Sequence, residues 1–143
     1  MRRFFFVLSL AVAAQSSPSM AQTDCVPATR HWIENTVACA ALFSAYAPFV
    51  YTNPGQEGRA ENLRSRAATL LRAAQRNARE IGDDPNSIQP LHNRLVAEYL
   101  KDEASLPAAV QQLRGTCDSA LKNAELSSAQ LQALLCTPSG GAK

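Results

Sequence analysis

A chain of 143 residues, 46% of them hydrophobic, is long enough for one ordinary globular domain with a single core. Its 14 basic and 12 acidic side chains give a formal charge of +2, and Arg2 and Arg3 account for that excess. Beyond these two residues the charges balance, so the basic excess is no argument for nucleic acid or a polyanionic substrate, and we expect no nucleic-acid partner.

Residues 1–21 have the pattern of a secretory signal peptide. Arg2 and Arg3 give a basic start, the run from Phe4 to Ala14 is apolar or small, and the small residues at 19 and 21 suit a cleavage site. This apolar run spans about 16 Å as a helix, about half of a bilayer core. We therefore expect cleavage near Ala21, a periplasmic or secreted protein, and no membrane span in the mature chain.

Residues 22–136 are rich in helix-forming Ala, Leu, Gln, Arg and Glu, and β-branched residues rarely cluster there. The sequence therefore predicts an all-α domain, a small helical bundle of four to five helices. The tail 137–143 is rich in Pro, Gly and Ser and is expected to be disordered.

The first helix is expected to run from about Pro27 or Thr29 to Ala47. Pro27 suits a first helical turn, and Pro48 should end the helix before the connection at Asn53-Pro54-Gly55.

Most aromatic residues of the mature chain lie in or just after this first helix. The apolar and aromatic positions are Trp32, Phe43, Tyr46, Phe49, Val50 and Tyr51. Either they complete the core of the bundle, or they form an exposed patch or the mouth of a pocket. Under the second interpretation, Tyr46, Phe49 and Tyr51 belong to a surface that binds a partner.

The second helix is expected to begin with Asn53 as N-cap and Pro54 in the first position, and to stop at Gly82. One narrow apolar stripe follows it at three- and four-residue spacing: Ala60, Leu63, Ala67, Leu70, Ala74, Ala78 and Ile81. The alternation of alanine with leucine lets a neighbouring helix approach closely.

Charge is unevenly distributed along the chain. Six arginines and three glutamates lie from Glu57 to Glu80. Seven acids and four bases lie from Ile81 to Glu125. Arg76 and Glu80 are expected to form an i,i+4 ion pair. Either the two regions are solvated faces that complement each other between antiparallel helices, or Arg72, Arg76 and Arg79 dock an acidic partner.

A third helix is expected over about Pro90 to Ala104. Its expected buried positions are Leu91, Leu95, Val96, Tyr99 and Leu100. Ser105 and Pro107 then start a fourth helical segment.

The course of the chain after this point has two interpretations. Gly115 and Thr116 are a candidate break, with Thr116 as the N-cap of a last helix. That last helix is either continuous or interrupted by a helix–turn–helix, because Ser127-x-x-Gln130 resembles a capping box.

Four cysteines behind an export signal indicate disulfides, and helix geometry restricts their pairing. Cys25 and Cys39 lie about 21 Å apart on one helix, beyond the reach of a disulfide. If the last helix is continuous, Cys117 and Cys136 lie about 28 Å apart and cannot pair either. Antiparallel packing of the first and last helices then requires Cys25–Cys136 with Cys39–Cys117.

The alternative pairing depends on a hairpin that turns near Leu126. Cys117 and Cys136 would then face each other across the turn, and Cys25 and Cys39 would be left with a strained bond or none. We favour the two bridges between the first and last helices. Zinc binding is disfavoured because the short Cys-x₂₋₄-Cys spacing is absent.

The sequence offers no recognisable catalytic, metal or cofactor site. Metal-dependent HExxH, phosphate-binding and GxSxG patterns are all absent. The one candidate is a pair at His31-x-x-Glu34, which His92 could approach from the third helix. We interpret both histidines as ordinary surface residues and expect no cofactor.

These observations favour an exported, non-enzymatic binding protein that acts on another envelope protein as an inhibitor, an immunity-type protein or an adaptor. One alternative is a carrier of a small hydrophobic ligand in the interior of the bundle. The other is a small enzyme with a site at His31, Glu34 and His92.

Overall fold

The computed structural model describes residues 25–136, so the predicted signal peptide 1–21 and the predicted tail 137–143 lie outside the described residues. Five α-helices and two short 3₁₀ helices follow one another: α1 Cys25–Tyr51, α2 Glu57–Glu80, η2 Pro85–Ser87, α3 Ile88–Tyr99, η3 Leu100–Ser105, α4 Leu106–Ala124 and α5 Ser128–Cys136. Between residues 25 and 136 there is no strand. The predicted all-α fold is therefore confirmed.

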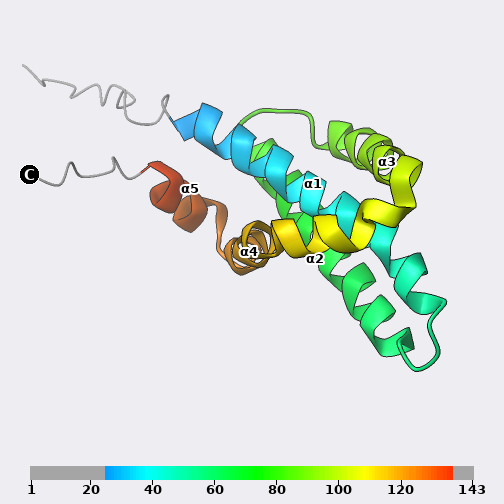
Figure 1. Ribbon diagram of the computed structural model, residues 1–143. Coiled ribbons are helices and arrows are strands. Elements are labelled where there is room, and N and C mark those ends of the chain that lie inside the picture. Colours follow the sequence, from blue (N-terminus) through cyan, green and yellow to red (C-terminus); the bar gives the residue numbers. More distant parts are fainter. Residues whose placement is uncertain (1–24, 137–143) are drawn as a thin grey trace, which may run out of the picture.

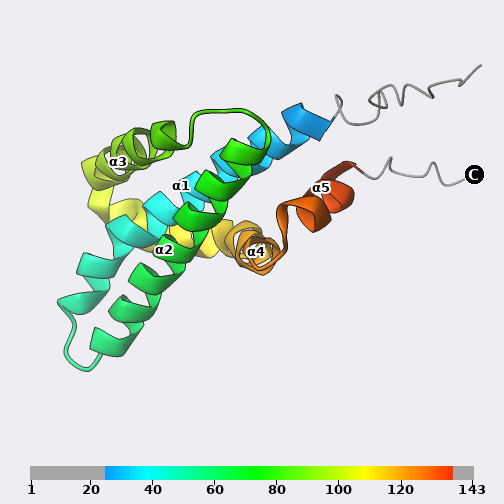
Figure 2. The same ribbon diagram turned by 180° about the vertical axis from the view of Figure 1, so that it is seen from behind.

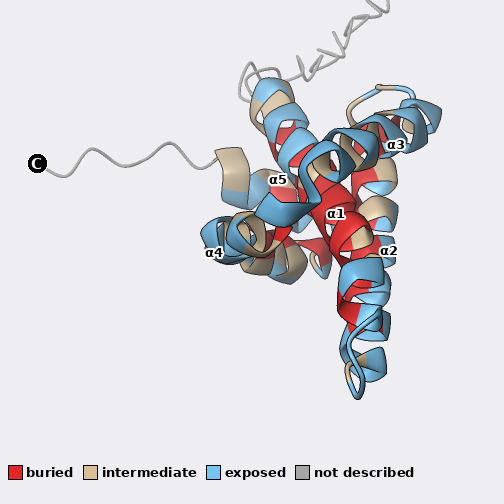
Figure 3. Cartoon of the chain, turned by 45° about the vertical axis from the view of Figure 1, so that its right-hand side comes forward, coloured by how far each residue is buried: buried red, intermediate tan, exposed pale blue. Residues whose placement is uncertain are grey.

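Helix α1 is the centre of the bundle. It forms an antiparallel hairpin with α2, and α3, α4 and α5 also contact it (Figures 1 and 2). Figure 3 shows that buried residues gather along α1, whereas α3 and α4 are largely exposed on their outer faces. Among the described helices, α1 is long and apolar enough to cross a membrane, but 67% of its most apolar stretch is buried inside the bundle. Packing against the other helices therefore accounts for its apolar character.

The predicted end of the first helix at Ala47 is wrong, because α1 continues through Pro48 to Tyr51. Pro48 has no N–H and cannot donate a helical hydrogen bond, but the helix continues because the next turn buries Val50. The helix end is closed by Thr52 Oγ1 and Asn53 Nδ2, which donate hydrogen bonds of 2.8 and 3.1 Å to one backbone carbonyl of the last turn.

Asn53 therefore caps the end of α1 and not the start of α2. Helix α2 begins at Glu57, later than predicted, and its N-cap Gln56 makes no side-chain capping bond. The predicted apolar stripe of α2 is confirmed from Ala60 to Ala78, and Ile81 is half-buried.

The predicted stop of α2 at Gly82 is confirmed. Gly82 has a positive φ of 81°, which favours glycine, and its N–H donates to the Arg79 carbonyl at 3.2 Å. The N–H of Asp83 reaches back to the Ala78 carbonyl at 2.9 Å, which completes a Schellman motif. This turn directs the Asp83 side chain toward α1.

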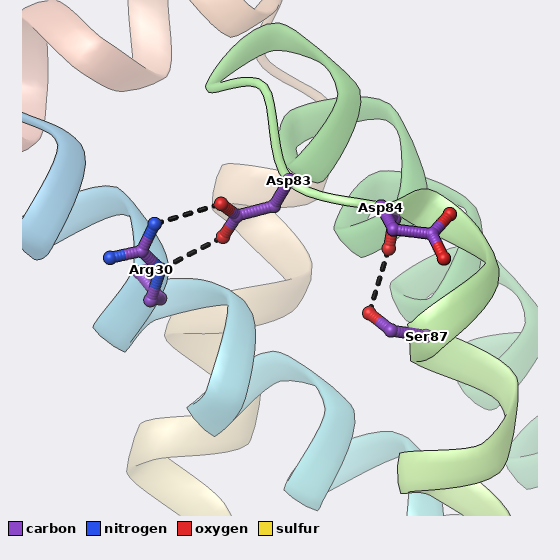
Figure 4. Close-up of polar contacts among 4 residues, drawn as sticks. All are labelled: Arg30, Asp83, Asp84 and Ser87. Carbon is purple, nitrogen blue, oxygen red and sulfur yellow. Dashed lines mark hydrogen bonds and ion pairs between the residues drawn. The ribbon is translucent and has the colours of Figure 1, made fainter.

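Asp83 receives two hydrogen bonds of 2.8 Å from Arg30 of α1, one to each carboxylate oxygen (Figure 4). This bidentate contact lowers the pKa of Asp83 below its ordinary value. Beyond it, Ser87 Oγ donates to the Asp84 carbonyl at 2.7 Å and Asp84 Oδ1 accepts from the Asn86 N–H at 2.9 Å. These bonds lead the chain into α3.

The boundaries predicted for the third helix are wrong at both ends. Helix α3 starts at Ile88, and the chain continues after Tyr99 as the 3₁₀ helix η3, whose backbone kinks at Asp102. The buried residues are Ile88 and His92. Of the predicted core positions, Leu91, Leu95, Val96 and Tyr99 are half-buried and Leu100 is 43% exposed. Helix α3 covers α1 from outside, so no second layer shields those side chains.

No break occurs at Gly115 or Thr116, and α4 runs without interruption to Ala124. The predicted capping box then starts α5. The Ser127 N–H donates to Gln130 Oε1 at 2.9 Å, and the Gln130 N–H donates to Ser127 Oγ at 3.2 Å. The last helix is therefore not continuous.

Two disulfides join the N-terminal and C-terminal helices as predicted. Cys25 is bonded to Cys136 and Cys39 to Cys117, with Cα–Cα distances of 5.3 and 5.4 Å. The pairing is confirmed although one premise of the geometric argument, a continuous last helix, is wrong. Helix α5 contacts α1 and α2, so its cysteine reaches the start of α1 and not Cys117. Two disulfides indicate an oxidising compartment.

Candidate binding groove

The aromatic residues of the predicted partner surface are divided between core and solvent. Tyr46 is buried, whereas Phe49 is 40% and Tyr51 53% exposed. Phe49 stacks on Tyr46 with ring centroids 5.6 Å apart, and the Arg64 guanidinium lies 5.4 Å from the centre of the Tyr51 ring. This end of the α1–α2 hairpin extends beyond the other helices (Figures 1 and 2).

The arginines of that predicted surface lie elsewhere. Arg72 is eight residues beyond Arg64, the residue of α2 that lies over the Tyr51 ring, which corresponds to about 12 Å along the helix. Arg76 does not form the expected pair with Glu80. It donates hydrogen bonds to the carbonyl oxygens of Ala124 and Leu126, at 3.1 and 2.8 Å. The aromatic and arginine residues thus do not form one continuous surface.

The candidate His/Glu site is not assembled. His31 is exposed and contacts Asn35 at 3.1 Å. The predicted surface position of His92 is wrong, because His92 is buried between α3 and α1 and contacts Ser44 at 3.0 Å. His31 and Ser44 are 13 positions apart on α1, about 20 Å along the helix axis. Within residues 25–136, no group of three or more His, Cys, Asp or Glu side chains could hold a metal ion.

A groove that the sequence did not reveal opens where α2 and α4 flank α1. Its volume is about 290 Å³, and its lining residues are Phe43, Arg59, Asn62, Leu63, Arg66, Val110, Gln111, Arg114 and Asp118. The apolar part consists of Phe43 from α1, Leu63 from α2 and Val110 from α4. The other side chains are all polar or charged. We call this site the α2–α4 groove.

The rim of the α2–α4 groove carries an excess of positive charge. Three arginines face one acid, and Asp118 lies 3.6 Å from the nearest guanidinium nitrogen of Arg66 and 3.9 Å from that of Arg114. Both separations exceed hydrogen-bond distance, so the guanidinium donors stay available. Arg59 forms no ion pair with another described residue. The groove therefore favours a negatively charged occupant.

A disulfide joins the α4 wall of the groove to α1, which forms its floor. Cys117 immediately precedes Asp118 on α4, and Cys39 lies one helical turn before Phe43 on α1. The bond between them fixes α4 against α1 beside the apolar floor. The groove therefore has a covalently held wall, and its shape does not depend on side-chain packing alone.

The sequence shows which groove residues share a face of the same helix, but not that the two helices lie side by side. Arg59, Asn62 and Arg66 lie at three- and four-residue steps and therefore share one face of α2, while Arg114 and Asp118 are an i,i+4 pair on α4. Bringing the two sets together requires knowing which face of α4 meets α2. That register depends on how α2 and α4 pack around α1, and neither helix alone shows it.

Comparison with known proteins adds no further assignment: no protein-family model, curated protein or solved structure matches the chain.

Proposed function

We propose that the mature chain is a non-enzymatic binding protein that acts on another envelope protein, in the periplasm or outside the cell. Export requires that residues 1–21 act as a signal peptide cleaved near Ala21, and the two disulfides are consistent with that destination. The proposed role is that of an inhibitor, an immunity-type protein or an adaptor.

The observation that carries the proposal is the α2–α4 groove on a covalently stapled scaffold. The groove has an apolar floor that can bury part of a ligand, and charged and amide side chains around it that can fix the orientation of that ligand. Binding sites usually have this composition. The covalent bond between α1 and α4 lowers the entropy cost of binding, because the backbone of the α4 wall is already held in place when the partner arrives.

The alternative of a hydrophobic carrier needs an enclosed apolar cavity inside the bundle. Between α1 and α2 the described core is filled by small residues in close contact, including the fully buried Ala40, Ala60 and Ala74. The α2–α4 groove itself is open to solvent and has a charged rim. These features favour a protein partner over a stored apolar ligand.

The test is affinity capture from an envelope fraction with three oxidised baits. One bait is the natural protein, the second carries Arg59→Gln and Arg114→Gln in the groove, and the third carries Arg72→Gln and Arg79→Gln outside it. The two variants lose equal charge. We expect the natural protein and the third bait to capture the same protein and the groove variant to lose it. Equal capture by all three baits, or no specific protein on any of them, would contradict the proposal.

A further inference from the structure

The size of the α2–α4 groove restricts what it can hold. Its volume of about 290 Å³ is at the lower limit of pockets that enclose a drug-sized molecule. A long acyl chain or a large cofactor would extend far beyond it. A large side chain and its neighbour on a peptide fit the space.

The charges on the rim indicate which residue is favoured next to the large side chain of such a peptide. A carboxylate already lies between Arg66 and Arg114. Asp118 of the same chain is 3.6 and 3.9 Å from their nearest guanidinium nitrogens. Those contacts are loose, and Arg59 has no acidic partner among the described residues. A second carboxylate therefore finds unused planar donors, which suit bidentate recognition.

Two amide side chains suit a peptide as the occupant of the groove. Asn62 stands on the α2 wall and Gln111 on the α4 wall. Each amide can both donate and accept a hydrogen bond, as a peptide backbone crossing the groove requires. The acyl chain of an anionic lipid offers no partner for either of them.

The outer rim of α4 also leaves space for a main chain. Gly115 follows Gln111 by four residues and precedes Asp118 by three, so it lies beside both on the helix surface. A Cβ at Gly115 would meet nothing within 4 Å. Packing therefore does not demand a glycine inside this helix, and close approach of a ligand to the backbone is one use of such a residue.

We infer that the α2–α4 groove binds an acidic peptide segment of the partner. One apolar side chain of that segment lies on Phe43, Leu63 and Val110. An adjacent Asp or Glu carboxylate contacts Arg59 and Arg114. This inference rests on the proposed function, since it names the part of the partner that is bound.

The test is selection from a random peptide library displayed on phage, with the oxidised protein as target. We expect enriched peptides to carry Asp or Glu next to Leu, Phe or Trp. A synthetic copy of the best peptide should bind about tenfold more weakly when its acid is replaced by the amide. The Arg59→Gln/Arg114→Gln variant should weaken binding by a similar factor, and the Arg72→Gln/Arg79→Gln variant by less than about twofold.

A second variant checks the position of the peptide without removing charge. Gly115→Trp places a bulky side chain on the rim and should abolish peptide binding. Gly115→Ala should preserve binding. If Gly115→Trp lowers the melting temperature strongly, the arginine variants decide the result alone.

Enrichment of neutral or basic peptides would overturn the inference, and so would unchanged affinity after the acid-to-amide change. Displacement of the selected peptide by laurate at comparable concentration would also overturn it, because the site would then prefer an anionic amphiphile. If capture from the envelope depends on the groove arginines while the selected peptides carry no acid, only this inference fails. If neither depends on those arginines, the proposed function fails as well.

Discussion

Arg76 of α2 donates a hydrogen bond of 3.1 Å to the backbone carbonyl of Ala124, the last residue of α4. A second bond of 2.8 Å reaches the carbonyl of Leu126 in the turn before α5. The last carbonyls of a helix lack partners within the helix, and a cation there also interacts favourably with the helix dipole. Arg76 thus links α2 to the end of α4 and to the turn that follows it, although its sequence context suggested a partner-binding role.

Replacing Arg76 should therefore destabilise the fold. Arg76→Gln is expected to lower the free energy of unfolding by about 1 kcal/mol, because two carbonyl groups lose a charged donor. Arg72→Gln is the matched control, since the one side-chain hydrogen bond of Arg72 to another described residue goes to the Thr69 hydroxyl, at 3.2 Å, and the change should alter stability by less than about 0.5 kcal/mol. Urea denaturation of the oxidised proteins measures both values. Equal effects of the two changes would show that the Arg76 bonds contribute nothing.

The disulfide pairing can be checked by tryptic mapping without reduction. Lysines and arginines place each cysteine in a different tryptic peptide, so every pairing yields a different linked product. We expect the peptide that contains Cys25 to be linked to the one that contains Cys136, and the peptide 31–59 to be linked to 115–122. A linked product of 115–122 with the Cys136 peptide would support the hairpin alternative instead.

Removal of the bridge beside the groove should weaken the whole domain. Cys39→Ala with Cys117→Ala opens a loop of 78 residues, which the chain-entropy model values at about 4–5 kcal/mol. Guanidinium denaturation should show this loss. The peptide selected on the natural protein should also bind this variant more weakly. An unchanged transition would mean that packing alone holds α4 in place.

The contact between Arg30 and Asp83 makes part of the stability dependent on pH. Arg30 lowers the pKa of Asp83 in the folded chain, so the unfolded chain binds the proton more readily. The contribution is therefore present above the ordinary carboxyl pKa of about 3.9 and is lost as the pH falls through the lower folded value.

Melting temperatures of the natural protein and Asp83→Asn should accordingly differ near neutral pH and converge at a pH below the lowered pKa of Asp83. The change is expected to be small, because both side chains are partly exposed. Asp102→Asn is the control, since its carboxylate forms no ion pair with another described residue. A difference that persists undiminished in acid would point to a role of Asp83 other than its charge.

Two glycines should respond in opposite directions to alanine. Gly82 has a positive φ of 81°, so Gly82→Ala should destabilise the protein by about 1 kcal/mol. Gly115 is inside α4 and an added Cβ meets nothing within 4 Å, so Gly115→Ala should stabilise it by about 0.5–1 kcal/mol. Thermal unfolding of both variants gives the comparison. A loss of stability in Gly115→Ala would indicate a packing role for the bare backbone at that position.

Local patterns predicted the parts of this fold that depend on neighbouring residues. The apolar stripe of α2, the stop at Gly82 and the capping box at Ser127 each involve residues within one or two turns, and all are confirmed. The cysteine pairing was predicted because a helix has a fixed rise per residue.

Boundaries that tertiary packing decides were predicted less well. Local propensity places a helix end at Pro48, but burial of Val50 extends α1 by one turn. That extension assigns Asn53 to the end of α1 and delays the start of α2 to Glu57. The α2–α4 groove was not predicted for the same reason, because it depends on which face of α4 meets α2.

The nested order of the two bridges has a consequence for survival in a protease-rich environment. Cys25–Cys136 encloses Cys39–Cys117 along the chain, so a single cut of the backbone anywhere between residues 25 and 136 leaves the two fragments covalently joined. A nick in the exposed segment η3 would separate α2 from α4 in sequence while both remain attached through α1. After one backbone cleavage between residues 25 and 136 the two fragments thus do not dissociate.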